Sequence, residues 1–317
     1  MEFQDVDLAN ERVFEACSEI WNAACGPELM VNPAFIAYNL RPSTGIERAG
    51  QLAWADGQPV GFVFVGAPLE GANLSLGWLE CVAVHPAYQQ RGIGSALLAW
   101  AERWLHAHKV RTVWLGGGLR PFAAGLPEPL QTAGFFERRG YAARAGSEYE
   151  WDVARDLGDY ASVVTRHAAD LRVLQPGEED ELLTFLRREF PGRWLYEVQE
   201  YFKEGGRPTD YMVLRTPQTG LDGFCWMTFE DSVRPLERFY MHRLPRPWGQ
   251  IGPLGVGKAC RGQGLGAALI DAAIGHVQQT GVRGCVIDWT NLLDLYARFG
   301  FQPYRKYTML AKSFQNV

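Results

Sequence analysis

Apolar and polar residues alternate in several stretches of this 317-residue chain in the way that β-strands require. Residues 57–66 (GQPVGFVFVG) and 221–230 (LDGFCWMTFE) are rich in β-branched and aromatic side chains and bounded by turn residues, which predicts strands. Residues 79–86 (LECVAVHP) predict a strand that ends at its proline, and 148–157 (EYEWDVARDL) predict another.

Helical spacing appears after two glycine-rich turns. Leu97, Ala101 and Leu105 recur at helical intervals after the first turn, and Leu269 and Val277 do so after the second. A short apolar strand follows each helix, RTVWLGG in the first case and RGCVIDW in the second. The order strand, glycine turn, helix, strand predicts an α/β (α+β) fold with a locally parallel strand pair.

The same pattern of motifs occurs twice. RGIGSALL in the first half matches RGQGLGAALI in the second, and FFERRGY matches LYARFGF further along. Gly266 follows Gly94 by 172 residues. Gly300 follows Gly140 by 160 residues, so the first copy carries about 12 additional residues between its two motifs. Two ordered matches predict an internal repeat of one fold.

The repeat divides the chain into two copies of about 150 residues each. We expect a first domain over 1–157, a linker over 158–170 and a second domain over 171–317. The additional residues of the first copy fall in 116–129 (GGGLRPFAAGLPEP), whose Gly and Pro content predicts a loop. This loop is either a wall of a substrate pocket or a plain surface loop.

Charge and composition exclude some function classes. The net charge of −5 does not favour a broad nucleic-acid-binding face. No apolar run approaches the roughly 18 residues of a membrane-spanning helix, and the first residues lack a signal-peptide core. The six cysteines form no CxxC or zinc-spaced cluster. We therefore expect a cytoplasmic protein with reduced thiols, no bound metal, and no nucleic-acid or membrane partner.

A glycine turn before a helix serves the binding of anions. The first N–H groups of a helix have no intrahelical partner, and the helix dipole adds positive charge there. Glycines leave these N–H groups accessible to a phosphate, and Arg91 or Arg261 could add charge. The turn is neither a Walker loop nor a dinucleotide fingerprint. The alternative is a helix start whose glycines allow close packing.

The segment VAVHPAYQQRGIGSALL resembles the cofactor signature of the GNAT superfamily of N-acyltransferases, and LYARFGF resembles a later motif of that family. The matching signature positions are Gln89, Gly92 and Gly94 in the first copy and Arg261, Gly264 and Gly266 in the second. The resemblance covers nearly the whole chain. It implies two tandem GNAT folds, each a mixed, mostly antiparallel sheet flanked by helices. The layout resembles that of tandem enzymes such as mycothiol synthase, although no residue assigns that substrate.

The resemblance also implies acetyl-CoA as the cofactor, with its pyrophosphate on the glycine turn and its pantetheine arm along the preceding strand. Asn291 matches a position that contacts the cofactor in the family, although it could instead cap a helix. The implied cofactor-binding residues are Val82, Ala83, Val84, Gln89, Gln90, Arg91, Gly92, Ile93, Gly94, Ser95, Leu254, Gly255, Val256, Arg261, Gly262, Gln263, Gly264, Leu265, Gly266, Ala267 and Asn291.

The resemblance implies different catalytic groups in the two copies. Tyr296 occupies the position of a tyrosine that protonates the leaving sulfur, whereas the first copy has Phe136 there. Glu80 matches a position of the general base, although a salt-bridged strand residue is the alternative; the second copy has Gly252 there. In the second copy Asp288 is the leading candidate base. Glu230, Glu237, His242 and a water chain are further candidates.

These residues predict an acetyl-CoA-dependent N-acetyltransferase that acts on the amine of a small molecule by direct attack. We expect the second copy to be catalytic and the first to bind cofactor. The alternatives are a non-catalytic acyl-CoA-binding or sensor protein, transfer to a peptide amine or a hydroxyl, and use of a longer acyl chain. The chain is expected to be a monomer or a homodimer.

Overall fold

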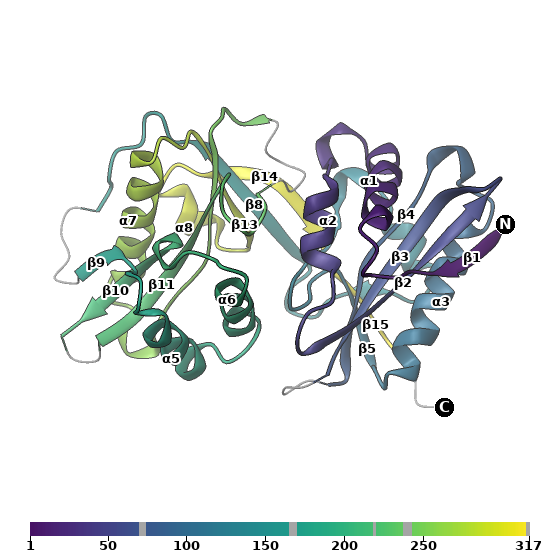
Figure 1. Ribbon diagram of the computed structural model, residues 1–317. Coiled ribbons are helices and arrows are strands. Elements are labelled where there is room, and N and C mark those ends of the chain that lie inside the picture. The colour runs from purple at the N-terminus through teal and green to yellow at the C-terminus, as the bar shows by residue number, and fades with distance from the viewer. Residues whose placement is uncertain (70–73, 165–169, 218–219, 237–242, 315–317) are drawn as a thin grey trace. The chain divides into compact units, whose positions relative to one another are not determined.

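A computed structural model describes residues 1–69, 74–164, 170–217, 220–236 and 243–314 of the chain (Figure 1). Their strands form a seven-stranded sheet and an eight-stranded sheet. The described residues divide into two compact units, one built from 1–150 and 305–314 and the other from 151–236 and 243–304. The predicted α/β class with two mixed, mostly antiparallel sheets is confirmed.

The seven-stranded sheet is antiparallel except for one parallel pair, β4 with β5. Its strands, in spatial order, are β1 (Glu2–Asp5), β2 (Ile46–Ala55), β3 (Gln58–Pro68), β4 (Leu76–Val84), β5 (Thr112–Leu115), β15 (Leu310–Ser313) and β7 (Ala142–Ala143). The helices of this unit are α1 (Arg12–Cys25), α2 (Pro33–Leu40), α3 (Ile93–Ala107) and α4 (Ala133–Glu137), with 3₁₀ turns at Pro27–Leu29, Pro86–Tyr88 and Glu128–Leu130.

Alternation along β3 directs its side chains to two layers. Val63 and Val65 belong to a buried cluster with Leu97 and Leu105 of α3. Phe62 and Phe64 are equally buried but point to the other face of the sheet, as the two-residue period requires. Residues 57–66, predicted as a strand, are apolar on both faces because both faces of β3 are covered.

The eight-stranded sheet repeats this plan, with the parallel pair at β12 and β13. In spatial order its strands are β6 (Leu126–Pro127), β14 (Gln302–Thr308), β8 (Tyr149–Asp156), β13 (Gly284–Thr290), β12 (Trp248–Val256), β11 (Gly220–Phe229), β10 (Tyr211–Thr216) and β9 (Asp170–Val173). The helices of the second unit are α5 (Glu179–Glu189), α6 (Arg193–Lys203), α7 (Leu265–Gln279) and α8 (Leu293–Ala297), with 3₁₀ turns at Pro208–Asp210 and Lys258–Cys260.

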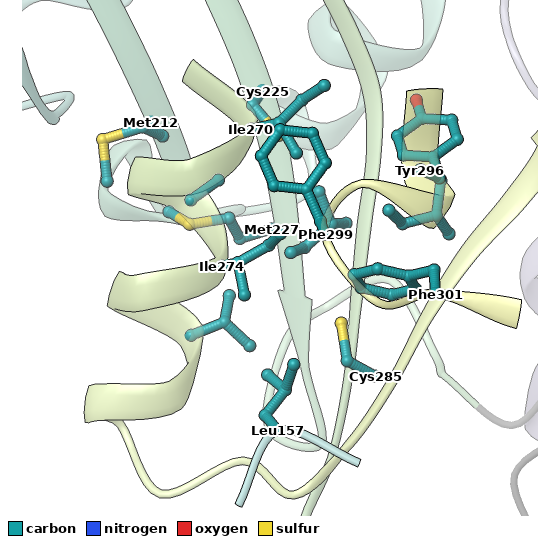
Figure 2. Packing of buried hydrophobic residues seen from close by; sticks show 14 of the residues in the cluster. Leu157, Met212, Cys225, Met227, Ile270, Ile274, Cys285, Tyr296, Phe299 and Phe301 are labelled. Carbon is teal, nitrogen blue, oxygen red and sulfur yellow. The ribbon is translucent and has the colours of Figure 1, made fainter. Parts of the chain in front are cut away.

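The core of the second unit lies between this sheet and α7. Figure 2 shows Ile270 and Ile274 of α7 among Met227, Cys285 and Phe301. These side chains are buried and form one cluster, so the apolar face of α7 packs against the sheet.

Each sheet takes in a strand from outside its own copy of the repeat. β15, at the end of the chain, pairs with β5 and β7 of the first sheet. β6 and β8, both within the predicted first domain, pair with β14 and β13 of the second sheet. The boundaries predicted at 157 and 171 therefore place all three strands in the domain opposite to the sheet in which they pair. Local alternation marks a strand but does not identify the sheet in which it pairs.

The start of the predicted linker is fixed to α7. The Asp271 carboxylate accepts hydrogen bonds from Tyr160 Oη at 2.6 Å, Ser162 Oγ at 2.6 Å and the Val163 N–H at 2.9 Å. Residues 165–169 of that linker lie outside the described residues. Within the described ranges, none of the helices combines the length and apolar character that crossing a membrane would require.

Candidate active site

Both glycine turns adopt the backbone geometry that an anion cradle needs. Gly92 precedes α3 with φ of 84° and Gly264 precedes α7 with φ of 77°, so each lies in the left-handed region that favours glycine. A Cβ added at Gly92 would meet no atom within 4 Å. Close packing therefore does not explain Gly92, and the space beside the first turn is open.

A β-bulge opens the first sheet beside its glycine turn. β4 pairs in parallel with β5 from Leu76 to Leu79, where β5 ends at Leu115. The β3–β4 register shifts between Cys81 and Leu79, which leaves Glu80 as the extra residue of a bulge. A bulge bends its strand and breaks the ladder. The edge of β4 beyond Leu79 is therefore released from β5.

A cavity of about 530 Å³ lies in this opening. Its walls come from β4, from the glycine turn, and from α1, α4 and the segment between β5 and β6, and all of its lining residues belong to the first unit. Glu80 and the residues of the glycine turn before α3 are both among its lining residues, so an ionisable residue and the turn share one cavity.

Most of the residues predicted for the first copy line this cavity. They are Glu80, Val82, Ala83, Val84, Gln89, Gln90, Gly92, Gly94 and Ser95. Two predicted neighbours do not line it. The Ile93 side chain is buried in the α3 core, and the Arg91 guanidinium lies 5.2 Å from the ring centre of Tyr88.

Glu80 lines the cavity and carries a fully buried carboxyl group. Its side chain has no solvent exposure, and neither carboxylate oxygen has a hydrogen-bond partner among the described residues. Arg48 Nε lies 3.7 Å from Glu80 Oε1, so the two side chains form the ion pair of the salt-bridged alternative. Burial raises the pKa of Glu80 to about 8, and the charge of Arg48 opposes this shift.

Sequence reasoning missed several residues of the cavity. Trp21 and Cys25 of α1 line it, and nothing in their local pattern distinguishes them from core residues of an amphipathic helix. Arg139 of the cavity wall donates a 2.6 Å hydrogen bond to Ser95 Oγ beside the turn. Arg48, which does not line the cavity, was also missed, although the structure places this charged residue at a buried position of β2.

The loop over 116–129 is buried and forms a wall of the cavity, so the alternative of a plain surface loop is wrong. Gly116, Ala123 and Gly125 line the cavity. Phe122 has no solvent exposure, and its ring centre lies 4.8 Å from that of Trp21. Apolar burial therefore fixes this segment against α1.

The second unit repeats the bulge with different residues. The register of β11 with β12 shifts between Cys225 and Met227, at Gly252 and Pro253, so Gly252 stands where the first copy has Glu80. Leu254, Gly255 and Val256 follow this bulge and pair with β11. The aligned position therefore carries no acid in the second unit, as the sequence predicts.

Asp288 and Tyr296 lie close to this second bulge. Arg234 Nη2 lies 3.9 Å from Asp288 Oδ2, and its Nη1 donates to the Gly252 carbonyl oxygen at 3.4 Å. Tyr296 is 5% exposed, and burial raises the pKa of its phenol, with contributions from Cys225 and Asp288. Figure 2 shows its hydroxyl directed away from Cys285 and Phe301. A neutral phenol of this kind can donate a proton.

Other second-copy candidates differ in their surroundings. Asn291 does not cap α8, because the N-cap residue is Leu292 and Thr290 Oγ1 accepts the Leu292 N–H. Glu230 already accepts hydrogen bonds from Arg246 and from the Trp248 N–H. Glu237 and His242 lie outside the described residues. The second-unit turn residues are Arg261, Gly262, Gln263, Gly264, Leu265, Gly266 and Ala267, which precede or begin α7.

Comparison with known proteins agrees with this geometry. A GNAT acetyltransferase domain matches residues 49–143, and the GNAT acetyltransferase family matches residues 179–301. A mycothiol acetyltransferase of Kineococcus radiotolerans is 30% identical over 241 residues, which is 69% of this chain and 67% of that relative. The chain belongs to the GNAT acetyltransferase family. A mycothiol acetyltransferase of Actinosynnema mirum is 26% identical over 87% of this chain and 88% of its own length.

Solved structures share the tandem GNAT fold. The glucosamine N-acetyltransferase region of a fungal multi-domain β-N-acetylglucosaminidase has a TM-score of 0.85 and 22% identity, covering 98% of this GNAT chain and 38% of that longer one. A tandem GNAT protein from the clavulanic acid biosynthesis pathway has a TM-score of 0.70 and 17% identity, covering 100% and 99%. The chain is therefore an N-acetyltransferase with two GNAT domains in tandem, rather than a non-catalytic acyl-CoA-binding protein.

Proposed function

We propose that this GNAT enzyme transfers the acetyl group of acetyl-CoA to the amine of a small molecule, and that the cavity of the first unit carries the reaction. The observation that supports this most strongly is that Gly92 of the glycine turn and Glu80, whose carboxyl group is buried, line one cavity. A phosphate site and a candidate base in one cavity are what a thioester carrier and an amine together require.

The residues of the first unit fit acetyl-CoA. The N–H groups of Gly92–Ser95 stand at the N-terminus of a 15-residue helix, where a pyrophosphate is favoured. Cys81–Val84 pair with β3 on one edge, and their other edge faces the opening beyond Leu115. That edge offers backbone groups for the amide-bearing arm of the cofactor. Bound here, acetyl-CoA supplies the activated acyl group.

Glu80 would act as the general base. An amine reaches the cavity as an ammonium ion and must lose a proton before it can attack the thioester. A carboxyl group whose pKa is about 8 takes up that proton efficiently near neutral pH, because its pKa is close to the working pH. Phe136 lines the same cavity and has no hydroxyl, so it offers no proton to the leaving sulfur.

The second unit provides a competing assignment. The charge of Asp288 contributes to the raised pKa of Tyr296, and Asp288 lies beside Gly252, so a phenol and a carboxylate are near the bulge that corresponds to Glu80 in the first unit. This arrangement favours a catalytic second copy with Tyr296 as the acid and Asp288 as the base. The two assignments use different residues in different units, and matched variants separate them.

The experiment measures thiol release from acetyl-CoA with a panel of small amines, which includes the acceptor of the mycothiol acetyltransferases and a peptide amine. Glu80→Gln should lower kcat by about 10²–10⁴-fold and leave the affinity for acetyl-CoA unchanged. Tyr296→Phe and Asp288→Asn should retain turnover. If Tyr296→Phe or Asp288→Asn abolishes turnover while Glu80→Gln retains it, the second unit carries the reaction.

A further inference from the structure

Arg48 is a buried cation directed at the carboxyl group of Glu80. It lies on β2, two strands away from Glu80 on β4, and its side chain is 1% exposed. Its Nε atom is 3.7 Å from Glu80 Oε1. A buried guanidinium loses its hydration, and its position beside the Glu80 carboxylate offsets part of that desolvation cost.

Two features fix the direction of this side chain. Arg48 Nη1 donates to Ser43 Oγ at 2.7 Å and to the Arg41 carbonyl oxygen at 3.3 Å. Between the two charges stands Gly66 of β3, which pairs with Arg48 in the β2–β3 register. A Cβ at Gly66 would lie 2.9 Å from Glu80 Oε1. The missing side chain therefore leaves the guanidinium and the carboxylate room to approach.

Few other ionisable groups act on this carboxyl. Cys81 of β4 interacts with Glu80 and with two thiols of α1, Cys17 and Cys25. Burial raises the pKa of Cys25 to about 12 and that of Cys17 further, so these thiols stay neutral near pH 7. Arg48 thus supplies the positive charge that stabilises the ionised form of Glu80.

We propose that Arg48 is a positioning residue of the acetyltransferase, which holds the Glu80 carboxyl at the cavity and keeps enough of it ionised to accept a proton from the amine. The proposal rests on the assignment of Glu80 as the base. Without a neighbouring cation, a carboxyl group in so apolar a place would stay protonated across the physiological range. It could then take no proton from the substrate.

The test compares the pH dependence of kcat/KM in Arg48→Met, Arg48→Lys and Arg305→Met. Arg305 is another buried arginine of the first unit, 5% exposed, whose Nη2 donates to the Glu28 carbonyl oxygen. In Arg48→Met the acidic limb of the pH profile should move to higher pH by about 1–3 units, the usual effect of losing an adjacent opposite charge. In Arg48→Lys the limb should lie close to its original pH, and in Arg305→Met it should not move.

The KM for acetyl-CoA should stay within about twofold of the original in Arg48→Met, since Arg48 is not among the residues lining the cavity. If the limb does not move in Arg48→Met, the proposal is overturned. If a variant is too weakly active to assay, infrared spectroscopy can follow the titration of the Glu80 carboxyl directly. The carboxyl band of Glu80 is identified by its absence from the spectrum of Glu80→Gln. Full activity in Glu80→Gln would instead refute the assignment of Glu80 as the base. In that case the infrared shift in Arg48→Met would report only the effect of Arg48 on the ionisation of Glu80.

Discussion

The exchange of strands between the two sheets predicts that each unit is destabilised by a mutation lying in the other half of the sequence. Leu310 of β15 is 1% exposed and packs in the core cluster of α3. Leu157, directly after β8, has no exposure and packs in the core cluster of α7. Leu310→Ala and Leu157→Ala are therefore matched substitutions in the two units.

Each substitution removes the same buried atoms, so their costs should be alike. Truncation of a buried leucine to alanine costs about 2–5 kcal/mol, because the transfer free energy is lost and a cavity remains. Both residues are almost fully buried, which places the expected loss in this range rather than near zero. A loss of that size should raise local amide exchange roughly 30-fold to several thousand-fold.

Hydrogen exchange resolved by mass spectrometry distinguishes the two units. Leu310→Ala should accelerate exchange in α3 more than in α7, and Leu157→Ala should accelerate it in α7 more than in α3. The leucine in the second half of the chain would then weaken the first unit, and the leucine in the first half would weaken the second. The opposite pattern, with Leu310→Ala acting mainly on α7, would refute the exchanged pairing.

Two further predictions concern the first unit. Gly92→Ala should weaken acetyl-CoA binding measured by calorimetry, because alanine is strained at the φ of 84° that the turn requires. The matched Gly275→Ala, in the interior of α7, should leave binding unchanged. Equal affinities in both variants and in the original protein would contradict a role for the turn. The pKa of Glu80 is raised from 4.5 to about 8, so between these values the folded protein holds a proton that the unfolded chain has released. The contribution of this proton to the free energy of unfolding is complete below pH 4.5 and is lost as the pH rises through about 8. Between about pH 5.5 and 7.5, the free energy of unfolding in urea should fall with pH more steeply in the original protein than in Glu80→Gln, by up to about 1.4 kcal/mol per pH unit. Equal slopes in the two proteins would show that the Glu80 carboxyl does not cause the pH dependence.

Several features of this protein are contained in short stretches of its sequence. The repeat, both glycine turns, and the strands and helices beside them follow from local periodicity and from the residues that a left-handed backbone requires. The alignment that places Glu80 opposite Gly252 also holds in the structure, where both residues stand at a bulge. Local rules suffice here because neighbouring residues determine turn geometry and amphipathic faces.

The tertiary structure decided what depends on residues far apart in the chain. The alternating residues of β8 identify a strand, but its pairing with β13 is set by the packing of Leu157 and Val153 in the second core. Similarly, Arg48 and Glu80 are separated by a whole strand in sequence, and their contact arises because β2, β3 and β4 lie side by side and Gly66 leaves space between them. The sequence alone thus determined the family and the two glycine turns. Long-range strand pairing and burial, which local patterns do not encode, decided the position of the cavity and the ionisation of its carboxyl group.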